Sequence, residues 1–436
     1  MRAIGIDIGT TTVSAVVLEE NGRVETMEVR ENGAFLPSPR PWERIQDPAR
    51  LLLLAEELTE QLLARYPDAS GIGVTGQQHG ILYLDGRGEA VSPLYTWQDG
   101  RGGRRYRGEE SYADWIRRET GCEVSPGYGL VTHFWLAQNG QIPERAAILC
   151  TICDYVAMKL CGRSAPALDA SHAAALGLYD LSENCFSQKA MEQLGLDPSI
   201  LPPVARSPIL GLYKGRYPVS VAIGDNQASF IGATGGKSRG VLVNVGTGSQ
   251  VSLYTPDLQR CEGLETRPFP GGGYLLVGAS LCGGRAYALL EQFFRQTVEM
   301  VTGERPECYD AMARLLEQGE PEEPLPRICP TFAGTRREPD RRGSITGLDT
   351  RNFTPRHLIW AMLRGMTDEL FAMYACVPEG ERALAEGFWG GGNGLRKNPQ
   401  LCGLMESRFG ASMTLSSGRE EAACGAALFL LRCLEQ

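Results

Sequence analysis

The chain contains 436 residues and carries a formal net charge of −9 at pH 7. This length exceeds what one hydrophobic core supports, so we expect two domains. The acidic balance argues against a broad nucleic-acid-binding face, and no apolar run approaches the ~18 residues of a membrane span. The N-terminus lacks a signal-peptide pattern, and the 13 scattered cysteines fit free thiols in a reducing compartment. We therefore expect a cytoplasmic globular protein that binds neither nucleic acid nor membranes.

A hairpin and a helix are the first predicted elements. Small and apolar residues alternate over 3–18 in two runs separated by threonines, which is typical of a β-hairpin. Asp47-Pro48 marks a helix start, because Asp caps a helix and Pro fits its first position. Leucines at helical spacing follow. A strand over 72–74 then leads into the sequence TGQQHG at 75–80.

The following region contains a polar loop, a cysteine pair and a basic cluster. A loop with the sequence TWQDGR at 96–101 ends the next apolar segment. Cys150 and Cys153 form a CxxC pair without a second pair or a neighbouring histidine, so they are a poor candidate for a metal site. A basic cluster predicts a solvated loop; it consists of Arg101, Arg104, Arg105 and Arg107.

One carboxylate stands at a strand-to-helix turn. Residues 219–223 alternate as a short strand, Gly224 interrupts the run, and 226–231 read as the first turns of an apolar helix. This pattern puts Asp225 at a strand end above a helix N-terminus, where a general base can face a substrate. The alternative is a helix N-cap, a role that Asp also serves.

The second half of the chain restarts the pattern of the first. Residues 235–240 have little to bury and form a candidate linker, so we expect an α/β chain with domains over 1–236 and 237–436. Beyond the linker a strand, a glycine turn and a strand follow over 241–254. The last predicted helix covers 420–434.

The restart repeats the first hairpin. DIGTTT at 7–12 and NVGTGS at 244–249 align residue by residue. Such turns offer backbone N–H groups and hydroxyls to phosphate, although each alone also suits a plain structural turn. As a pair they indicate duplicated domains that clamp a phosphate, and no Walker motif GxxxxGK[ST] occurs. An acid such as Asp225 beside this cradle favours phosphoryl transfer to a hydroxyl.

Several separated motifs resemble those of the FGGY carbohydrate kinases, which belong to the actin-like sugar kinases. They are DIGTT at 7–11, GDNQ at 224–227, GTGS at 246–249, GSITGL at 343–348 and GGGN at 390–393. The resemblance covers essentially the whole chain. It implies two actin-like (ribonuclease H-like) domains, each with a β-hairpin-led sheet plus helices, and a nucleotide cleft between them.

Within the family, the motifs are most similar to the sedoheptulokinase branch. GQQHG at 76–80 is similar to the motif of the sedoheptulokinases and xylulokinases, and TWQDGR at 96–101 resembles the sedoheptulokinase pattern. Arg364 points the same way, because xylulose and glycerol kinases usually carry an acid there. His172 departs from the family, where an amide is expected, and the sequence assigns it no role.

The resemblance implies ATP-dependent phosphorylation of a ketose primary hydroxyl, with sedoheptulose 7-phosphate as the expected product. Asp225 is then the general base, and Asp7 and Asp225 lie near Mg²⁺ and reach it through water. The implied sugar-binding residues are Gln78, His79, Trp97, Asp99 and Asn226. The implied ATP-binding residues are Thr10, Thr11, Thr12, Gly246, Thr247, Gly248, Gly334, Gly391, Gly392 and Asn393.

Other roles remain open for some of these side chains. His79 also suits a structural imidazole, Trp97 suits core packing, and Asp7 could stabilise its own turn. His133 is better explained as a buried histidine whose hydrogen bonds are satisfied.

Other functions also remain open. A xylulokinase-type or other pentulose kinase is the nearest alternative. A non-catalytic, actin-like ATP-binding protein would keep both hairpins but would have no use for Asp225 or His79. A degenerate kinase that senses sugar conflicts with the presence of Asp7 and Asp225. The expected partners are a small ketose and ATP, and a homodimer is compatible with the family.

Overall fold

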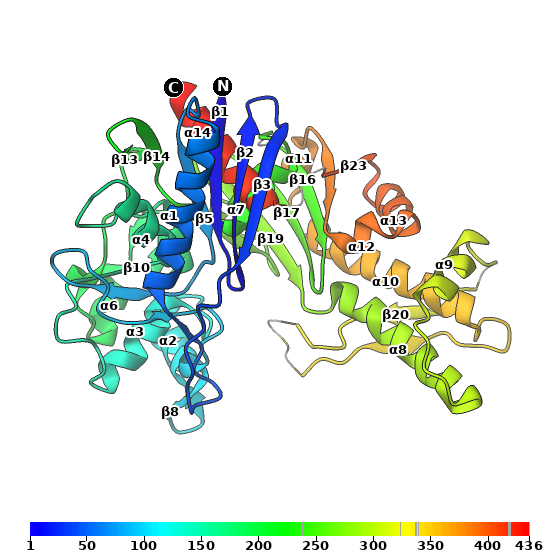
Figure 1. Cartoon of the computed structure of the whole chain (residues 1–436). Coiled ribbons are helices and arrows are strands. Elements are labelled where there is room, and N and C mark those ends of the chain that lie inside the picture. Colours follow the sequence, from blue (N-terminus) through cyan, green and yellow to red (C-terminus); the bar gives the residue numbers. More distant parts are fainter. Residues whose placement is uncertain (238, 323, 336–337, 339, 417–419, 436) are drawn as a thin grey trace. The chain divides into compact units, whose positions relative to one another are not determined.

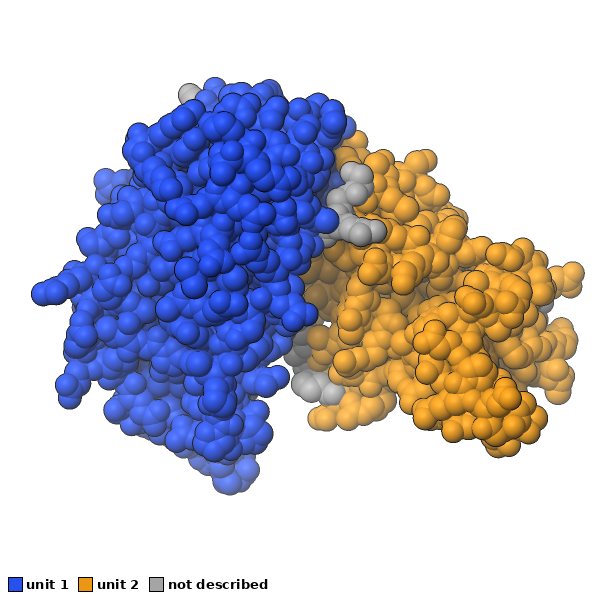
Figure 2. All heavy atoms as spheres, in the orientation of Figure 1, with its two compact units in different colours: residues 1–237, 267–274, 418–436 blue, residues 238–266, 275–417 orange. Residues whose placement is uncertain are grey.

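The chain folds into two compact units, each with its own β-sheet (Figure 1). The computed structural model describes residues 1–237, 239–322, 324–335, 338, 340–416 and 420–435. The first unit comprises residues 1–237, 267–274 and 418–436, and the second comprises 238–266 and 275–417 (Figure 2). The chain first leaves the first unit after Lys237, next to the expected boundary. It returns to the first unit at residues 267–274 and again at 418–436. The last helix therefore belongs to the first unit, whereas the expected boundary at 236 would place it in the second.

The first unit is built on a seven-stranded mixed sheet. Its strand order is β13-β14-β5-β1-β2-β3, and β15 also pairs with β5. β1 is antiparallel to β2 and parallel to β5. The strands are β1 (Arg2–Ile8), β2 (Thr12–Glu19), β3 (Val24–Glu31), β5 (Ile72–Gly76), β13 (Ile209–Tyr213), β14 (Tyr217–Ser220) and β15 (Ile223–Gly224).

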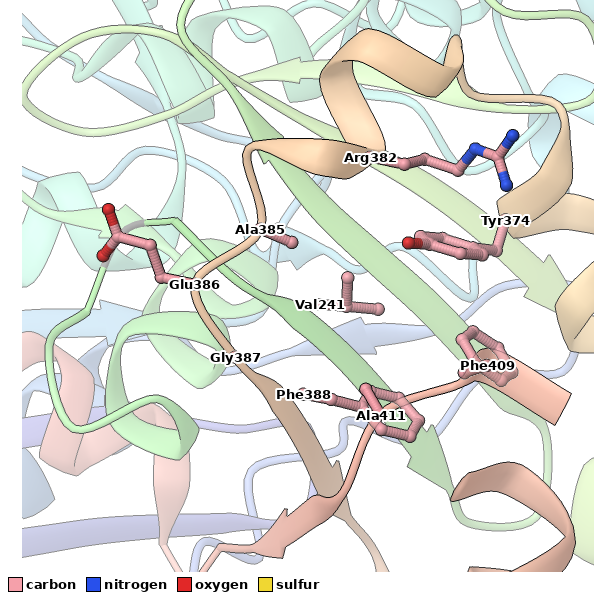
Figure 3. A pocket seen from close by; sticks show the side chains of 9 residues that line it. All are labelled: Val241, Tyr374, Arg382, Ala385, Glu386, Gly387, Phe388, Phe409 and Ala411. Atoms are coloured by element: carbon pink, nitrogen blue, oxygen red, sulfur yellow. The ribbon is translucent and has the colours of Figure 1, made fainter. Parts of the chain in front are cut away.

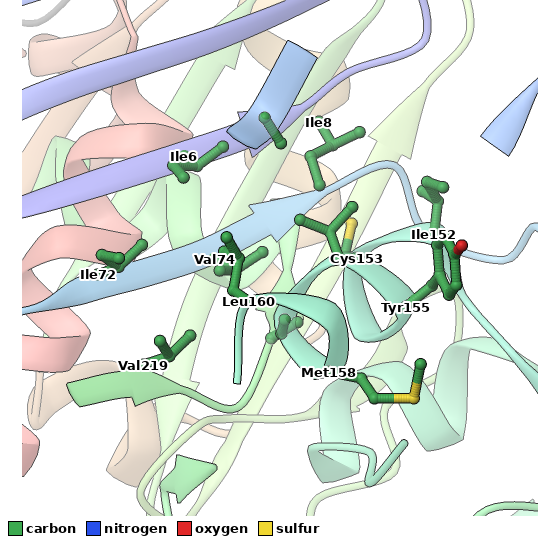
Figure 4. Close-up of a cluster of buried hydrophobic side chains, with 14 of the residues drawn as sticks. Ile6, Ile8, Ile72, Val74, Ile152, Cys153, Tyr155, Met158, Leu160 and Val219 are labelled. Atoms are coloured by element: carbon green, nitrogen blue, oxygen red, sulfur yellow. The ribbon is translucent and has the colours of Figure 1, made fainter. Parts of the chain in front are cut away.

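One face of this sheet builds the main apolar core of the first unit. Successive strand side chains point to opposite faces, so Ile6 and Ile8 of β1 lie on the same side. They join Val74 of β5 and Ile152 of α4 (Ile152–Leu160) in a fully buried cluster (Figure 4). Leucines of α1 (Pro48–Arg65) complete the cluster. The alternating isoleucines that predict the first strand are therefore the residues that this strand buries in the core.

The opposite face of β1 is covered by the C-terminal helix α14 (Glu421–Glu435). A Cβ atom on Gly5 would lie 1.8 Å from the backbone oxygen of Ala423. One on Gly73 of β5 would lie 2.0 Å from the backbone oxygen of Ala426. Only glycine allows so close an approach, and this packing ties the end of the chain to the first unit. On the same side lies α7 (Asp225–Ala233), which also packs against α14.

A second apolar cluster of the first unit lies among α2, α3 and α6, beside small two-stranded sheets. The remaining helices of this unit are α2 (Tyr112–Thr120), α3 (Gly129–Gln138), α5 (Ala170–Ala175), α6 (Gln188–Leu194), η1 (Arg101–Gly103) and η2 (Pro198–Ile200). The short strands are β4 (Ile45–Gln46), β6 (Leu82–Leu84), β7 (Leu94–Tyr95), β8 (Arg105–Arg107), β9 (Glu110–Ser111), β10 (Ile148–Cys150), β11 (Tyr179–Asp180) and β12 (Cys185–Phe186).

The second unit repeats the plan of the first. Its main sheet has the order β18-β19-β17-β16-β22-β23, and β16 is antiparallel to β17 and parallel to β22. The strands that lie wholly or partly in this unit are β16 (Val241–Val245), β17 (Ser249–Thr255), β18 (Glu265–Pro268), β19 (Tyr274–Ser280), β20 (Arg327–Cys329), β21 (Ser344–Thr346), β22 (Phe388–Gly391) and β23 (Met413–Leu415). The helices are α8 (Gly283–Thr302), α9 (Tyr309–Glu317), α10 (Pro355–Ala375), α11 (Glu379–Ala383), α12 (Asn393–Arg396) and α13 (Pro399–Phe409).

Most of the predicted elements are present. The expected hairpin over 3–18 is β1 with β2, and its repeat is β16 with β17, so the duplication is confirmed. The Asp47 side chain caps α1 by accepting a hydrogen bond of 2.9 Å from the Ala49 N–H. The expected single strand over 219–223 is divided between β14 and β15. Among the described helices, none combines the length and hydropathy that a membrane span requires.

Candidate active site

The carboxyl ends of three neighbouring strands meet at one edge of the first sheet. β1 and β15 run parallel to β5 on its two sides. Asp7 is level with Thr75, and Thr75 is level with Ile223, whose carbonyl accepts a 2.7 Å hydrogen bond from the Thr75 hydroxyl. Asp225 follows directly after β15, and Gln77 and Gln78 follow β5. Ligands of open α/β sheets bind outside this edge, so the fold gathers these polar groups where a substrate can reach them.

Asp225 is the first residue of α7, and the N-cap is Gly224 before it. The helix has no side-chain capping bond, so the alternative role of Asp225 as an N-cap is wrong. Its side chain is partly buried. Burial raises the pKa of Asp225, while the neighbouring Arg267 and His172 and a hydrogen bond from the Asn226 backbone hold it down. A carboxylate with a raised pKa is better matched to general-base work near neutral pH.

Asp7 lies in a strongly acidic environment. Burial, together with the charges of Asp225 and Glu420, raises the pKa of Asp7 to about 7. A divalent cation would relieve the repulsion between these carboxylates. Within the described part of the chain, no group of three or more metal-ligating side chains is assembled. The two carboxylates of Asp7 and Asp225 suit Mg²⁺, which often keeps several waters and takes only one or two protein carboxylates.

Gln78 and His79 follow β5. The Gln78 side-chain amide donates a 3.1 Å hydrogen bond to Gln227 of α7, which links the two strand ends. His79 has a left-handed backbone with φ of 70°, and its ring stacks on Tyr128 with centroids 4.4 Å apart. Because the carbonyl of Ala175 can only accept, Nδ1 of His79 must donate in their 2.6 Å contact. In the neutral ring, Nε2 is then an acceptor that suits a sugar hydroxyl.

The turn of the first hairpin is held from behind by side chains. Asn32 donates to the carbonyl of Gly9 at 3.0 Å, and Gln46 donates to the carbonyl of Thr10 at 2.7 Å. The Trp97 indole N–H donates to the Thr10 hydroxyl at 2.9 Å, and 47% of Trp97 is exposed. Core packing is therefore the wrong interpretation of Trp97. Thr11 is exposed and Thr10 and Thr12 are partly exposed, as phosphate donors need to be.

Asp99 does not have the environment of a sugar ligand. Its side chain is fully buried, and both carboxylate oxygens accept hydrogen bonds from the Arg101 guanidinium at 2.6 to 3.1 Å. Arg101 is also only 1% exposed and packs over Tyr95 with its charge 4.2 Å from the ring centroid. The solvated loop predicted for this arginine is therefore wrong. Asp99 and Arg101 form a buried ion pair, so Asp99 supports the loop rather than facing ligand.

Two buried acceptors at the same edge lack hydrogen-bond partners within the described structure. They are the side-chain oxygens of Asn226 and Gln77. The Gln77 amide itself donates to Gln46 at 2.9 Å, which fixes its orientation. Because buried polar atoms are rarely left unpaired, these oxygens require donors from water or a ligand. The hydroxyls of a sugar would supply such donors.

A buried network that the sequence did not predict lies behind Asp225. Ser171 accepts a 3.0 Å hydrogen bond from the Gly224 N–H and donates to Asp169. Next to it, Nδ1 of His172 lies 3.1 Å from Asp154. The only sequence signal was the unexpected histidine itself. By contrast, His133 is buried and bonded to the Tyr83 hydroxyl at 2.6 Å, as expected, and burial lowers the pKa of His133 to about 4.

The glycine turn of the second unit rests on the start of α8. The N–H groups of Gly284 and Arg285 donate to the carbonyls of Gly246 and Thr247 at 2.8 and 3.0 Å. A Cβ on Gly283 would lie 2.4 Å from the carbonyl carbon of residue 248, so glycine is required for this contact. A glycine turn at the N-terminus of a long helix is a favourable phosphate site. The glycine pair after β19 is the signal in the sequence from which this support could have been predicted.

The other glycine motif of the second unit lies at the adjacent strand end. Gly391 is level with Asn244 in the parallel pair of β22 and β16. Gly392 has φ of 84°, and a Cβ there would lie 2.4 Å from the Val245 carbonyl oxygen. Asn393 is exposed at the start of α12. The structure therefore brings these residues to the strand end that carries the 246–248 turn.

Gly334 lies in a separate turn of the same unit. Its N–H donates to the Thr331 carbonyl at 3.0 Å, and its φ is 74°. Backbone groups of Phe332 and Ala333 reach the thiol of Cys282, immediately before α8. This loop therefore packs next to the helix that supports the 246–248 turn.

One hollow of the second unit lies at the other end of the sheet. It has a volume of about 280 Å³ and opens at the first residues of β16 and β22, Val241 and Phe388. Tyr374, Arg382 and Phe409 form its walls (Figure 3). The glycine motifs are at the carboxyl ends of these strands, so the hollow is not the expected phosphate site.

The comparison with known families decides the identity of the chain. Residues 2–232 match the N-terminal domain of the FGGY family of carbohydrate kinases, and this match covers more than half of the 436 residues. The chain belongs to the FGGY family of carbohydrate kinases. It is therefore an ATP-dependent kinase that transfers a phosphoryl group to a carbohydrate hydroxyl. The family predicted from the sequence motifs is therefore confirmed.

This kinase is similar to relatives along its whole length. It is 28% identical to sedoheptulokinase from Mus musculus, with 98% of this chain and 97% of the relative covered. Xylulose kinase from Rhodospirillum rubrum has a TM-score of 0.83 at 22% identity, with 99% of this chain and 89% of that chain covered. Glycerol kinase from Plasmodium falciparum, solved with ADP, has a TM-score of 0.79 at 18% identity, with coverages of 98% and 88%. These likenesses confirm the two-domain, actin-like fold.

Proposed function

We propose that this kinase phosphorylates the primary hydroxyl of a ketose, and that sedoheptulose is the substrate and sedoheptulose 7-phosphate the product. One observation carries the proposal: Asp225 and Gln78 follow the ends of the adjacent strands β15 and β5, and His79 comes directly after Gln78. The similarity to the mouse sedoheptulokinase over 98% of the chain supports this choice of sugar. The GQQHG motif at 76–80 supports a ketose in general.

The proposed roles divide between the units. In the first unit, Asp225 accepts the proton of the attacking hydroxyl and orients its oxygen, while His79 and Asn226 position the rest of the sugar. In the second unit, the 246–248 turn and the start of α8 hold the phosphates of ATP, and Gly391 to Asn393 pass close to the adenosine. Mg²⁺, when bound near Asp7, would neutralise charge on the phosphate oxygens.

The decisive experiment is a competition among ketoses. The purified kinase is incubated with Mg-ATP and an equimolar mixture of five- to seven-carbon ketoses, and the phosphorylated products are identified by mass. We expect a seven-carbon monophosphate to appear first. A parallel reaction with Asp225→Asn controls for contaminating kinases.

Other outcomes distinguish the alternatives. A five-carbon product formed first would replace sedoheptulose with a xylulose-type substrate and would keep the chemistry. ATP hydrolysis that does not depend on sugar, without any phosphorylated ketose, would contradict the whole proposal.

A further inference from the structure

The buried network behind Asp225 contains a histidine that the proposed chemistry does not use. His172 is completely buried in the first turn of α5. Its Nδ1 lies 3.1 Å from Oδ1 of Asp154, a side chain that is itself fully buried. The other oxygen of Asp154 accepts a 2.6 Å hydrogen bond from the Thr151 hydroxyl. Asp154 is therefore held as an acceptor on both sides, and Nδ1 of His172 must be the donor.

The surroundings of His172 are acidic on every element for which a charged neighbour is described. Asp154 approaches from α4, Asp169 precedes α5, and Asp225 begins α7. Burial by itself would favour the neutral ring, but these three carboxylates outweigh it and raise the pKa of His172. The second ring nitrogen, Nε2, is buried and has no hydrogen-bond partner within the described structure. An imidazolium is the species that balances the charge of Asp154.

The residue next to His172 contacts the segment that carries Asp225. Ser171 accepts a 3.0 Å hydrogen bond from the N–H of Gly224, the N-cap of α7. Ser171 and His172 share the first turn of α5, so the ion pair with Asp154 fixes the position of this turn. A change at His172 is thereby transmitted to the backbone immediately before the proposed base.

We propose that His172 is a positively charged positioning residue that, paired with Asp154, holds Ser171 against Gly224 and so keeps Asp225 aligned with the sugar hydroxyl. This inference rests on the proposed role of Asp225. It accounts for a histidine where the family resemblance leads one to expect an amide. A neutral amide could keep the hydrogen bond to Asp154 but would leave its charge unbalanced.

The charge of His172 can be observed without any substrate. The chain has four histidines, so the ring resonances can be assigned in the full-length protein by single substitutions. In ¹⁵N-edited spectra at pH 7, both ring nitrogens of His172 should be protonated. His133 is the internal reference for a buried neutral ring, since burial lowers its pKa to about 4. A neutral spectrum for His172 would overturn the proposal whichever sugar the kinase uses.

The positioning role is tested by His172→Asn, which keeps a donor near the place of Nδ1 and removes the charge. Misplacement of a catalytic group by about 1 Å can cost ~10²-fold in rate, so we expect a loss of kcat of this order with little change in the KM for the sugar. His133→Asn is the matched control, because it replaces a buried neutral histidine of the same unit, and its kcat should not change. A folded His172→Asn variant with the kcat of the wild type would contradict the proposal.

A second substitution separates the charge from simple packing. If an unpaired Asp154 causes the defect of His172→Asn, then adding Asp154→Asn should restore much of the lost kcat, because two amides can bond without net charge. Independent losses that multiply in the double variant would contradict the ion pair. If the wild-type kinase turned over no ketose, the proposed function would fail, and the spectra would still decide the charge of His172.

Discussion

The two hairpin turns share a backbone plan and differ in what supports them. The turn of the first unit is held by side chains, because Asn32 and Gln46 donate to its carbonyls. The turn of the second unit is held by backbone, because Gly284 and Arg285 at the start of α8 donate to its carbonyls. A helix N-terminus against a glycine turn adds partial positive charge, which favours phosphate. We therefore propose that the turn of the second unit is the one that holds the phosphates of the nucleotide.

The turns also differ in charge. Asp7 of β1 corresponds to Asn244 of β16 in the aligned motifs. Burial and the nearby acids Asp225 and Glu420 raise the pKa of Asp7 to about 7. In the second unit the neutral amide of Asn244 lies beside Gly392, where a Cβ would approach its oxygen to 2.5 Å. The acid-bearing turn thus suits a cation and the neutral turn suits an anionic ligand.

Removal of the proposed base should have the largest effect. Asp225→Asn keeps the size of the side chain and removes its basicity, so kcat should fall by ~10²–10⁴-fold. The melting temperature should stay close to that of the wild type, since Asp225 does not cap α7. Steady-state kinetics on the folded variant give the answer, and near-normal turnover would remove Asp225 from the mechanism.

Placing an acid in the neutral turn of the second unit should have the next largest effect. Asn244→Asp places an acid beside the proposed phosphate site, and about 1.4 kcal/mol of repulsion would raise the KM for ATP roughly tenfold. Asn244→Ala is the control, because it removes the amide without adding charge. Equal KM values for ATP in the two variants would argue that the turn does not face the triphosphate.

The close approach at Gly392 predicts a loss of both stability and ATP binding when a side chain is added there. In Gly392→Ala the new methyl would meet the Val245 carbonyl at 2.4 Å, at a φ of 84°. Such strain costs of order 1–3 kcal/mol, and ATP should bind more weakly. Gly403 of α13 is the matched control, since a methyl added there would meet no atom within 4 Å, and alanine should stabilise by about 0.4–1 kcal/mol. Thermal unfolding with and without ATP compares the two, and similar behaviour would contradict the packing argument.

Asp7→Asn should change how stability depends on pH. In the folded protein the pKa of Asp7 is about 7, above its ordinary value of 3.8, so the folded state binds the proton more tightly than the unfolded chain. The wild type should therefore lose stability as the pH rises from about 4 to about 7. The advantage of Asp7→Asn in melting temperature should grow over this range and level off above it. Metal-free thermal scans test this, and a constant difference would contradict the raised pKa.

The smallest effect is expected at Trp97. Trp97→Phe keeps an aromatic face and removes the 2.9 Å hydrogen bond to Thr10, which is worth about 0.5–1.5 kcal/mol. Because 47% of the residue is exposed, the melting temperature should barely move while the KM for the sugar rises severalfold. A large loss of stability would instead indicate a core residue.

Local patterns predicted the elements whose causes are local. The alternation over 3–18 predicted β1 and β2, and Asp47-Pro48 predicted the start of α1. The repeat of the hairpin followed from direct alignment of the two motifs. The strand-to-helix turn also placed Asp225 correctly, although its N-cap is Gly224.

The failures have non-local causes. Asp99 was predicted to face the sugar, because nothing in a linear sequence shows that Arg101 is buried and occupies both of its oxygens. The network of His172 and Asp154 joins α5 to α4, which are separated in the chain, so no spacing rule could predict it. The membership of α14 in the first unit likewise depends on its contacts with β1 and β5 at the other end of the chain.

The packing of α14 has a consequence for biosynthesis. The glycines of β1 and β5 stay uncovered until the last helix is made, so the first unit cannot complete its fold while the ribosome is still translating the second. The sheet face that α14 covers therefore stays open until residues 421–435 have been made. A nascent chain arrested before α14 should therefore be sensitive to protease around β1 and β5, even though most of the first unit has already been made.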